Sequence, residues 1–178
     1  IGAKSSEVPI VAIQLYIKGG HRFENKNQAG IAELMTSMLN ESTTKHSAEE
    51  LDELLERLGS EIDIDHNGED IIVDISTLTK NIDTTLSLAE EILFHPKFDA
   101  EEFDIVKNQQ LESIANQATQ ATVIAANVYA KLLYGNENIM GIPLLGTEAT
   151  VSNLNLEDVK KYYAESLSPS MTTAVVVG

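Results

Sequence analysis

The sequence contains no cysteine and no long apolar run. The absence of cysteine excludes disulfide bonds and thiolate metal ligands within these residues. No apolar stretch approaches the roughly 20 residues that a membrane-spanning helix needs. Neither absence identifies a compartment, since a chain without cysteine suits the cytoplasm and the periplasm equally well.

Basic residues are scarce: 12 Lys and Arg stand against 28 Asp and Glu, giving a formal net charge of −16. A surface with this charge repels polyanions, so we expect no nucleic-acid partner and no binding to an anionic membrane. The acidic excess fits either a solvated surface that keeps the chain soluble or an acidic binding face. The first interpretation is preferred because such surfaces are common in soluble proteins.

With 43% hydrophobic residues, the 178-residue chain has enough apolar side chains for one core. We therefore expect a single domain over residues 1–178. The sequence begins at Ile1 without an initiator methionine and stops at Gly178, directly after the strand-like run Val175–Val177. These ends favour a piece of a longer protein.

The stretch from Gly30 to Thr43 has the clearest helical pattern. Apolar residues recur there at steps of three and four, at Ile31, Leu34, Met35, Met38 and Leu39. Glu33, Thr36 and Ser37 share the opposite stripe. We expect these polar side chains to project together from the side of the helix that faces away from the core.

The remaining patterns predict strands and further helices. Pro9–Lys18 and the residues on both sides of Asn67 alternate between apolar and polar, and Asn67–Gly68 is a strong signal for a two-residue hairpin turn. Helical patterns follow a capping box at Ser47 and fill much of the sequence between residues 81 and 166, with a break near 117–120 and a stop at Gly135. This order favours an α+β fold with a mainly antiparallel sheet covered on one face by helices, rather than a doubly wound parallel sheet.

Three segments resemble the pitrilysin/insulinase family of zinc metallopeptidases, the inverzincins, whose motif is His-x-x-Glu-His. Gly30-Ile31-Ala32 and Ser42-Thr43 align with the two ends of that family's active-site helix, Gly20–Glu24 with its Gly-Ser-Arg-x-Glu turn, and Gly141–Thr147 with its Gly-x-Pro-x-x-Gly-Thr segment. The resemblance covers essentially the whole chain. It implies the half-unit fold of pitrilysin and the mitochondrial processing peptidase.

The residues that carry the family's chemistry are replaced. In this register Glu33 stands at the first zinc histidine, Thr36 at the general base and Ser37 at the second histidine, while the third ligand falls near Ser113, or Glu112 if the register differs by one. A zinc hydrolase needs three protein ligands, an open position for water and a base. We therefore expect no catalytic residue and no metal ligand in this segment, with zinc held by a catalytic half or partner subunit.

The resemblance also implies a peptide partner, because the exposed side of the family's sheet lines a chamber that holds an extended peptide. By alternation, that side would carry Gln14, Tyr16, Asp63, Asp65 and Asp74, which could favour basic peptide segments. A rival interpretation groups Glu61, Asp63, Asp65 and His66 into a metal site. Alternation places His66 on the opposite face, so a solvated acidic face is preferred.

The function expected from the resemblance is that of a non-catalytic domain of a bacterial zinc-dependent metalloendopeptidase. It would help form the peptide chamber and pack on a catalytic half. The alternative is a purely structural or docking protein on the same fold. A third interpretation, an active peptidase with unusual ligands, is disfavoured because at least three motif positions are lost together. The bacterial members of the family favour the periplasm, and the cytoplasm is the alternative.

Overall fold

The computed structural model describes residues 2–3 and 9–178; residues 1 and 4–8 of the expected domain 1–178 lie outside it. The described strands are β1 (Gly2–Ala3), β2 (Ile10–Lys18), β3 (Glu61–His66), β4 (Asp70–Leu78) and β5 (Thr172–Val177). The helices are α1 (Ile31–Leu39), α2 (Ala48–Leu58), α3 (Ile82–Phe94), α4 (Ala100–Gln117), α5 (Ala121–Tyr134), α6 (Glu148–Asn153) and α7 (Leu156–Ser166). Among the described residues, no helix combines the length and apolar composition needed to cross a bilayer.

The strands form one sheet in the order β1-β5-β2-β4-β3. β2 pairs antiparallel with both β4 and β5, β3 pairs antiparallel with β4, and the short β1 runs parallel to β5. Gln14 lies between Val175 and Asp74, and Asp63 lies opposite Asp74. The mainly antiparallel α+β fold predicted from the sequence is confirmed.

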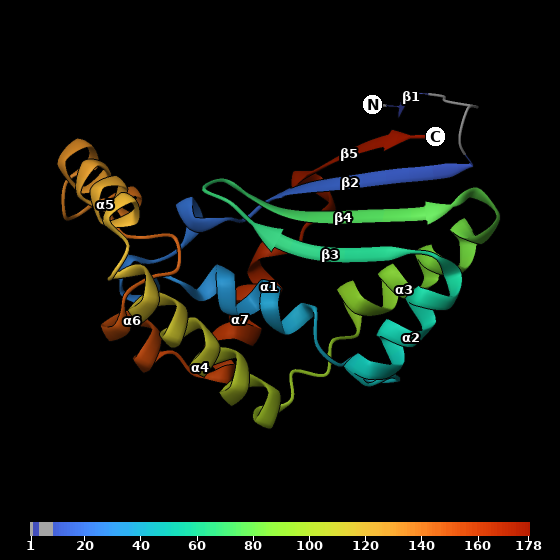
Figure 1. Ribbon diagram of the computed structural model, residues 1–178, viewed down its shortest axis with the longest axis horizontal. Coiled ribbons are helices and arrows are strands. Elements are labelled where there is room, and N and C mark those ends of the chain that lie inside the picture. Colours follow the sequence, from blue (N-terminus) through green and yellow to red (C-terminus); the bar gives the residue numbers. More distant parts are fainter. Residues whose placement is uncertain (1, 4–8) are drawn as a thin grey trace.

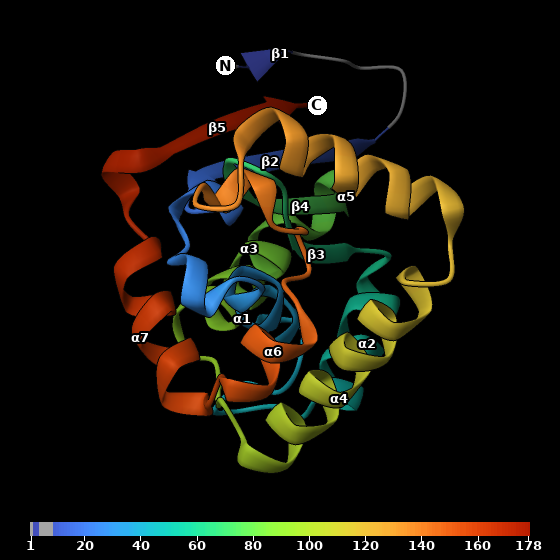
Figure 2. The ribbon, with the colours of Figure 1, turned by 90° about the vertical axis from the view of Figure 1, so that its left-hand side faces the viewer.

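The helices cover one face of this sheet. Figures 1 and 2 show α1, α2 and α3 beneath the sheet, with α4, α6 and α7 grouped around α1, while no described helix lies over the opposite face. The inward side chains of β2, β3 and β4 meet those of α1 in one hydrophobic core. On β3 the outer face carries the acidic side chains that the alternation predicted, at Glu61, Asp63 and Asp65.

Helix α1 is the centre of the core and is buried on almost every side. It lies against β3, α4 and α7, and Leu34, Met35 and Met38 are fully buried. Burying each such side chain contributes about 1.5–3 kcal/mol to folding. The predicted exposure of Thr36 is wrong, since it is only 2% exposed. Helices pack on both sides of α1, and the sequence pattern of α1 alone could not show them.

Three family-like segments meet at the N-terminus of α1. Gly30 and Gly146 both have positive φ, and a side chain on Gly146 would come within 2.2 Å of the Ala29 carbonyl oxygen. Glu24 accepts hydrogen bonds from the backbone N–H groups of Gly30 (3.0 Å) and Ala32 (2.9 Å). These groups have no partner within a helix, so Glu24 caps α1 from the loop that precedes the helix. Because Gly30 and Gly146 lack side chains, the loop at Gly146 can lie directly against the start of α1.

The turn between β3 and β4 differs from the prediction. His66 pairs with Ile71, and neither Asn67 nor Gly68 has the positive φ that a two-residue type I′ turn requires. Instead the side-chain oxygen of Asn67 accepts from the backbone N–H groups of Glu69 (2.8 Å) and Asp70 (2.9 Å). The predicted hairpin of β3 and β4 is therefore confirmed, but its turn is closed by the side chain of Asn67, as asparagine favours, and is not a two-residue turn.

The predicted helices are present, and their caps explain their ends. Ser47 makes the expected capping box with Glu50, Gly59 closes α2 in the left-handed conformation, and the expected break separates α4 from α5. Helix α5 lies at one end of the molecule, beyond the sheet (Figure 1). It has no buried residue, and its large apolar side chains are exposed: Ile124, Val128, Tyr129, Leu132, Leu133 and Tyr134.

Candidate functional site

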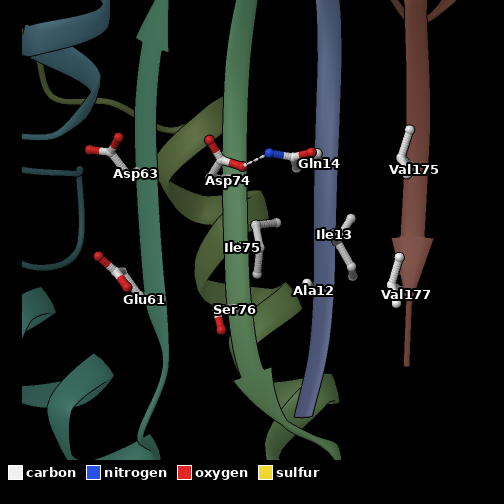
Figure 3. A pocket seen from close by; sticks show the side chains of 10 residues that line it. All are labelled: Ala12, Ile13, Gln14, Glu61, Asp63, Asp74, Ile75, Ser76, Val175 and Val177. Carbon is white, nitrogen blue, oxygen red and sulfur yellow. Dashed lines mark hydrogen bonds between the residues drawn. The ribbon is translucent and has the colours of Figure 1, made fainter. Parts of the chain in front are cut away.

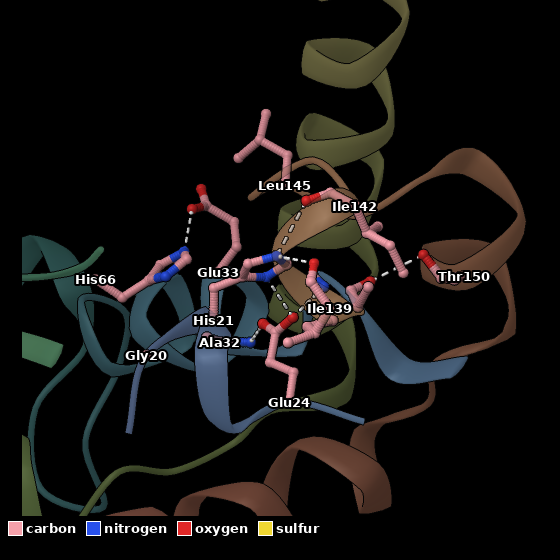
Figure 4. A network of polar contacts seen from close by, with 12 residues as sticks. Gly20, His21, Glu24, Ala32, Glu33, His66, Ile139, Ile142, Leu145 and Thr150 are labelled. Carbon is pink, nitrogen blue, oxygen red and sulfur yellow. Dashed lines mark hydrogen bonds and ion pairs between the residues drawn. The ribbon is translucent and has the colours of Figure 1, made fainter. Parts of the chain in front are cut away.

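The first motif position, Glu33, is paired with a histidine from the sheet. The carboxylate of Glu33 lies 3.1 Å from Nε2 of His66, whose side chain is completely buried at the end of β3. Figure 4 shows the two side chains pointing toward each other across the gap between α1 and β3. Among the residues that the structure describes, Glu33 therefore has a structural partner. Apart from the inward position of His66, no local pattern predicted this pair.

The next two motif positions carry hydroxyl groups, and that of Thr36 is used structurally. Thr36 Oγ1 donates to the carbonyl oxygens of Ala32 (3.1 Å) and Glu33 (3.2 Å), one turn back in the same helix. Ser37 is half-buried. Neither side chain can take a proton from water at neutral pH, so α1 supplies no general base at the position where the family has one.

The structure does not bring the fourth motif position to α1. Ser113 and Glu112 are exposed on α4, and among the described residues no hydrogen bond joins Ser113 to Glu33, Thr36 or Ser37. The α4 residue that reaches the start of α1 is Gln110, whose amide donates to the carbonyl oxygens of Gly30 (3.0 Å) and Leu145 (2.8 Å). Within the described chain, no three His, Cys, Asp or Glu side chains are grouped so that they could hold a metal ion.

The free edge of β3 beside α1 is partly occupied. Asn40, at the end of α1, donates from Nδ2 to the Ile64 carbonyl (2.8 Å) and accepts from the Ile64 N–H (3.1 Å). β3 is an edge strand of the described sheet, and an edge strand offers such groups to an added peptide strand. At Ile64 the side chain of Asn40 takes both groups, so a peptide could not pair with this residue without displacing it.

A second polar centre, beside the first, is the buried pair His21 and Glu24. His21 Nδ1 lies 2.8 Å from Glu24 Oε2, while Nε2 lies 2.9 Å from the Ile139 carbonyl and 3.1 Å from the Ile142 carbonyl (Figure 4). Burial lowers the pKa of His21, but the hydrogen bond and charge of Glu24, together with the carbonyls, outweigh it and raise the pKa above 6.5. Both residues belong to the family-like turn Gly20–Glu24, but no sequence pattern indicated that they would be buried as a pair.

The outer face of the sheet contains a shallow hollow of about 340 Å³. Figure 3 shows its lining across β3, β4, β2 and β5, with Asp63, Asp74 and Gln14 in one row. Gln14 Nε2 donates to Asp74 Oδ1, and Tyr16 donates to Gln14 Oε1 at 3.1 Å. The lining residues are Ala12, Ile13, Gln14, Glu61, Asp63, Asp74, Ile75, Ser76, Val175 and Val177.

Of the five residues predicted for peptide contact, Gln14, Asp63 and Asp74 line this hollow. Tyr16 lies beside it through its bond to Gln14, and Asp65 is exposed further along β3. The contributions of β5 were missed because the sequence does not show that β5 lies next to β2. Alternation along β3 placed Glu61 on the same face as Asp63, as the structure does, but Glu61 was not among the residues predicted for peptide contact.

The acidic side chains of this face, Glu61, Asp63, Asp65 and Asp74, repel one another. The pKa of Asp63 is raised above its ordinary value, first by burial and then by the negative charges of Asp65, Asp74 and Glu61. Like charges this close destabilise each other unless a cation approaches. The hollow is therefore suited to a positively charged group, and His66, on the opposite face, takes no part in it.

The comparisons with known proteins identify a family profile. The description of that profile is insulinase, peptidase family M16, and it matches residues 2–148. The segments that this match spans include the start of α1 and the loop Gly141–Thr147 that packs against it.

Two curated relatives and one solved structure are similar over nearly the whole chain. A Helicobacter pylori protein named non-peptidase homolog YmxG is 26% identical over 171 residues, which cover 96% of the chain and 39% of that protein. A Bacillus subtilis protein named uncharacterized zinc protease YmxG is 27% identical over 168 residues, 94% of the chain and 41% of that protein. A crystal structure of a peptidase M16 inactive domain from Pseudomonas fluorescens has a TM-score of 0.93 at 21% identity, covering 99% of the chain and 43% of that structure. The chain thus spans about two fifths of the length of its relatives.

Proposed function

Since the chain belongs to the insulinase family, peptidase family M16, we propose that it is a non-catalytic domain of a bacterial zinc-dependent metalloendopeptidase. The domain packs on a catalytic half of the same family and forms part of the wall around an extended peptide. Residues 1–178 make up one domain of a longer protein, the first of its inactive half. The bacterial members of the family favour the periplasm for that protein, and the cytoplasm is the alternative.

One observation carries this proposal: at two of the four motif positions the side chain has a structural partner. Glu33 is paired with His66, and the hydroxyl of Thr36 is bonded to the backbone of its own helix. Zinc binds histidine far better than a serine or threonine hydroxyl, and hydrolysis needs a base beside the bound water. Zinc, its ligands and the base then reside on the catalytic half.

The catalytic part of the proposal is tested by metal analysis of the purified 178-residue chain. We expect less than 0.1 zinc per chain after dialysis against micromolar zinc, and no cleavage of unfolded peptides. A chain in which Glu33→His, Thr36→Glu and Ser37→His restore the motif serves as the comparison. Stoichiometric zinc on the unaltered chain, with peptide cleavage abolished by a chelator, would contradict the proposal.

The peptide contact is supported by the acidic hollow on the outer sheet face. Asp63 and Asp74 face each other across the pairing of β3 and β4, and the raised pKa of Asp63 reflects its acidic neighbours. A lysine or arginine side chain entering the hollow would relieve this repulsion. Gln14 and Tyr16 extend the same face with groups that can bond to a peptide backbone. Asp65 extends the acidic row along β3.

The test is the double variant Asp63→Asn with Asp74→Asn in the full-length protein with its catalytic half. Exposed charge pairs are worth about 0.2–1 kcal/mol each, so we expect the loss of two such pairs to lower kcat/KM for basic peptides about 2- to 30-fold, with neutral peptides unaffected. Asp104→Asn, on the exposed side of α4, is the matched control. Unchanged kcat/KM for both basic and neutral peptides in the double variant would rule out the contact while leaving the domain assignment intact.

The alternative function is a purely structural or docking domain without a peptidase partner. The exposed apolar side chains of α5 favour this alternative, because such a surface is typical of protein contact sites. The two functions differ in one readily observed feature. A peptidase complex requires an intact His-x-x-Glu-His, followed at the family distance by Glu, in the same longer chain or in a subunit that copurifies with it.

A further inference from the structure

The ring of His21 is fixed between acceptors on both sides. Nδ1 lies 2.8 Å from the Glu24 carboxylate, and Nε2 lies within 3.1 Å of the carbonyl oxygens of Ile139 and Ile142. His21 is only 2% exposed, so water cannot replace these partners. A neutral imidazole carries one N–H and one lone pair, whereas the imidazolium carries two N–H groups. Only the imidazolium satisfies every partner.

These partners belong to segments far apart in the sequence. Glu24 caps the N-terminus of α1 through Gly30 and Ala32, and the two carbonyls belong to the 3₁₀ turn Ile139–Gly141 and the residue after it. That turn is packed against the end of α5, since a side chain on Gly141 would lie 2.2 Å from the Gly135 carbonyl oxygen. His21 therefore joins the start of the central helix to the base of the exposed one.

We propose that His21, Glu24 and the segment Ile139–Ile142 form a proton-dependent clamp that holds the base of α5. The clamp is closed while His21 carries both ring protons. Loss of one proton places a lone pair against an oxygen in a buried site, which costs free energy that only displacement of one partner can recover. Glu24 is also held by two backbone N–H groups of α1, so the partner that moves is the turn.

Among the titratable groups around this site, His21 is the one whose protonation changes near neutral pH. Tyr162 of α7 lies against the same loop, bonding to the Gly19 carbonyl, and its pKa is raised by burial and by the charge of Glu24, so it stays protonated. The other nearby charged groups are already paired. They are Lys26 with Glu137, Glu33 with His66, Arg22 with Glu69, and Lys18 with Asp70.

The direction of the switch follows from the pKa. The pKa of His21 in the folded state lies above the ordinary 6.5, because Glu24 and the carbonyls outweigh burial. The clamp then adds its full stability below pH 6.5 and loses it as the pH rises through the folded pKa. A shift to alkaline pH releases the turn and frees α5.

The experiment is an NMR titration of the 178-residue chain with labelled histidine, combined with amide exchange at Gly141 and Ile142, whose N–H groups bond within the turn. We expect two ring N–H signals for His21 at pH 6. As His21 titrates, the exchange protection, corrected for the intrinsic rate, falls by up to tenfold per pH unit. A single ring N–H throughout, or titration of His21 without loss of protection, overturns the proposal.

Variants separate the clamp from general effects of pH. His21→Ser introduces the serine that the family-like turn has, and it is expected to make the exchange at Gly141 and Ile142 independent of pH between 6 and 9. His46→Ser is the matched control, because His46 also pairs with a carboxylate, Glu91 at 2.8 Å, and is expected to keep the unaltered pH dependence. If His21→Ser does not fold, the titration of the unaltered chain decides alone. A pH-dependent turn in a folded His21→Ser chain contradicts the clamp.

Discussion

The pair Glu33 and His66 shows how single residues adapt a scaffold that lacks its metal. Where active relatives are expected to hold zinc, a carboxylate from α1 receives a hydrogen bond from a histidine of β3 at 3.1 Å. The histidine side chain is fully buried, and its second ring nitrogen has only a long contact, 3.4 Å, to the Asn67 carbonyl. The pair links the central helix to the sheet. Loss of the Glu33 carboxylate would leave the buried Nε2 of His66 without its partner.

Replacing Glu33 by Ala should therefore destabilise the domain. A buried donor left unpaired costs about 1–3 kcal/mol, and Glu33→Gln, which keeps an acceptor oxygen, should cost less. Ser37→Ala, one turn later on α1, is the control and should change the free energy of unfolding by less than about 0.5 kcal/mol. Urea unfolding followed by circular dichroism measures all three. An unchanged unfolding midpoint for Glu33→Ala would show that the pair is not a stabilising contact.

Among the elements, α1 and α5 are opposites. Both have strongly apolar sequences, yet α1 is enclosed by the sheet and by helices, whereas α5 has no buried residue, and Leu132 is 82% exposed. From Ser113 to Asn136 the chain has no acidic residue, although the whole sequence has 28. Exposed apolar surfaces are typical of places where a domain contacts another domain or another protein.

The contrast between the two helices predicts different costs for similar truncations. Met38→Ala, in the fully buried part of α1, should lower the free energy of unfolding by about 2–5 kcal/mol. Leu132→Ser, on α5, should change it by no more than about 0.5 kcal/mol. Thermal unfolding of both variants beside the unaltered chain is the measurement. A loss of several kcal/mol in Leu132→Ser would mean that α5 is packed against the domain in solution.

These elements also show what the sequence could and could not predict. Periodicity and capping residues located the helices, because both signals are local: the capping box at Ser47 and the stop at Gly135 are examples. Burial depends on which elements become neighbours. The apolar stripe of α5 was therefore no guide to its exposure, and the polar position of Thr36 was no guide to its burial.

For the candidate site too, local patterns predicted positions along the chain but not contacts between distant segments. Register against the family motif located Glu33, Thr36 and Ser37 on α1, and alternation located the acidic face. Neither could show that His66 would reach Glu33, or that β5 would complete the hollow, because these contacts join distant parts of the chain. The ring contacts of His21, with residues more than a hundred positions away, had no local signal at all.

At the scale of the whole molecule, net charge and individual pKa values act in the same direction. The formal charge of −16 makes the folded state repel itself at neutral pH. Burial, followed by acidic neighbours, raises the pKa of both Asp63 and Glu41, so the fold favours their neutral forms. Each of these groups makes the domain less stable as the pH rises through its titration range, and so does His21 above 6.5.

Glu91 makes the domain less stable at low pH. Burial raises its pKa, but hydrogen bonds from Thr43 and His46 outweigh burial and hold it below the ordinary 4.5. The stability that Glu91 contributes is therefore present above pH 4.5 and is lost as the pH falls through the folded pKa. Together with the groups that favour low pH, this places the maximum of stability on the weakly acidic side, between about 4.5 and 6.5.

The thermal midpoint should therefore fall as the pH rises from 6 to 9, and salt should separate the two causes. The screening length is about 10 Å at 0.1 M salt and about 3 Å at 1 M, so high salt weakens the repulsion between surface charges but leaves the buried pair of His21 and Glu24 almost unaffected. In 1 M NaCl we expect a smaller decline, which His21→Ser should remove. Scanning calorimetry at both salt concentrations measures it. A midpoint that rises toward pH 9 at low salt would show that surface repulsion and the protonated His21 do not control the stability of this domain.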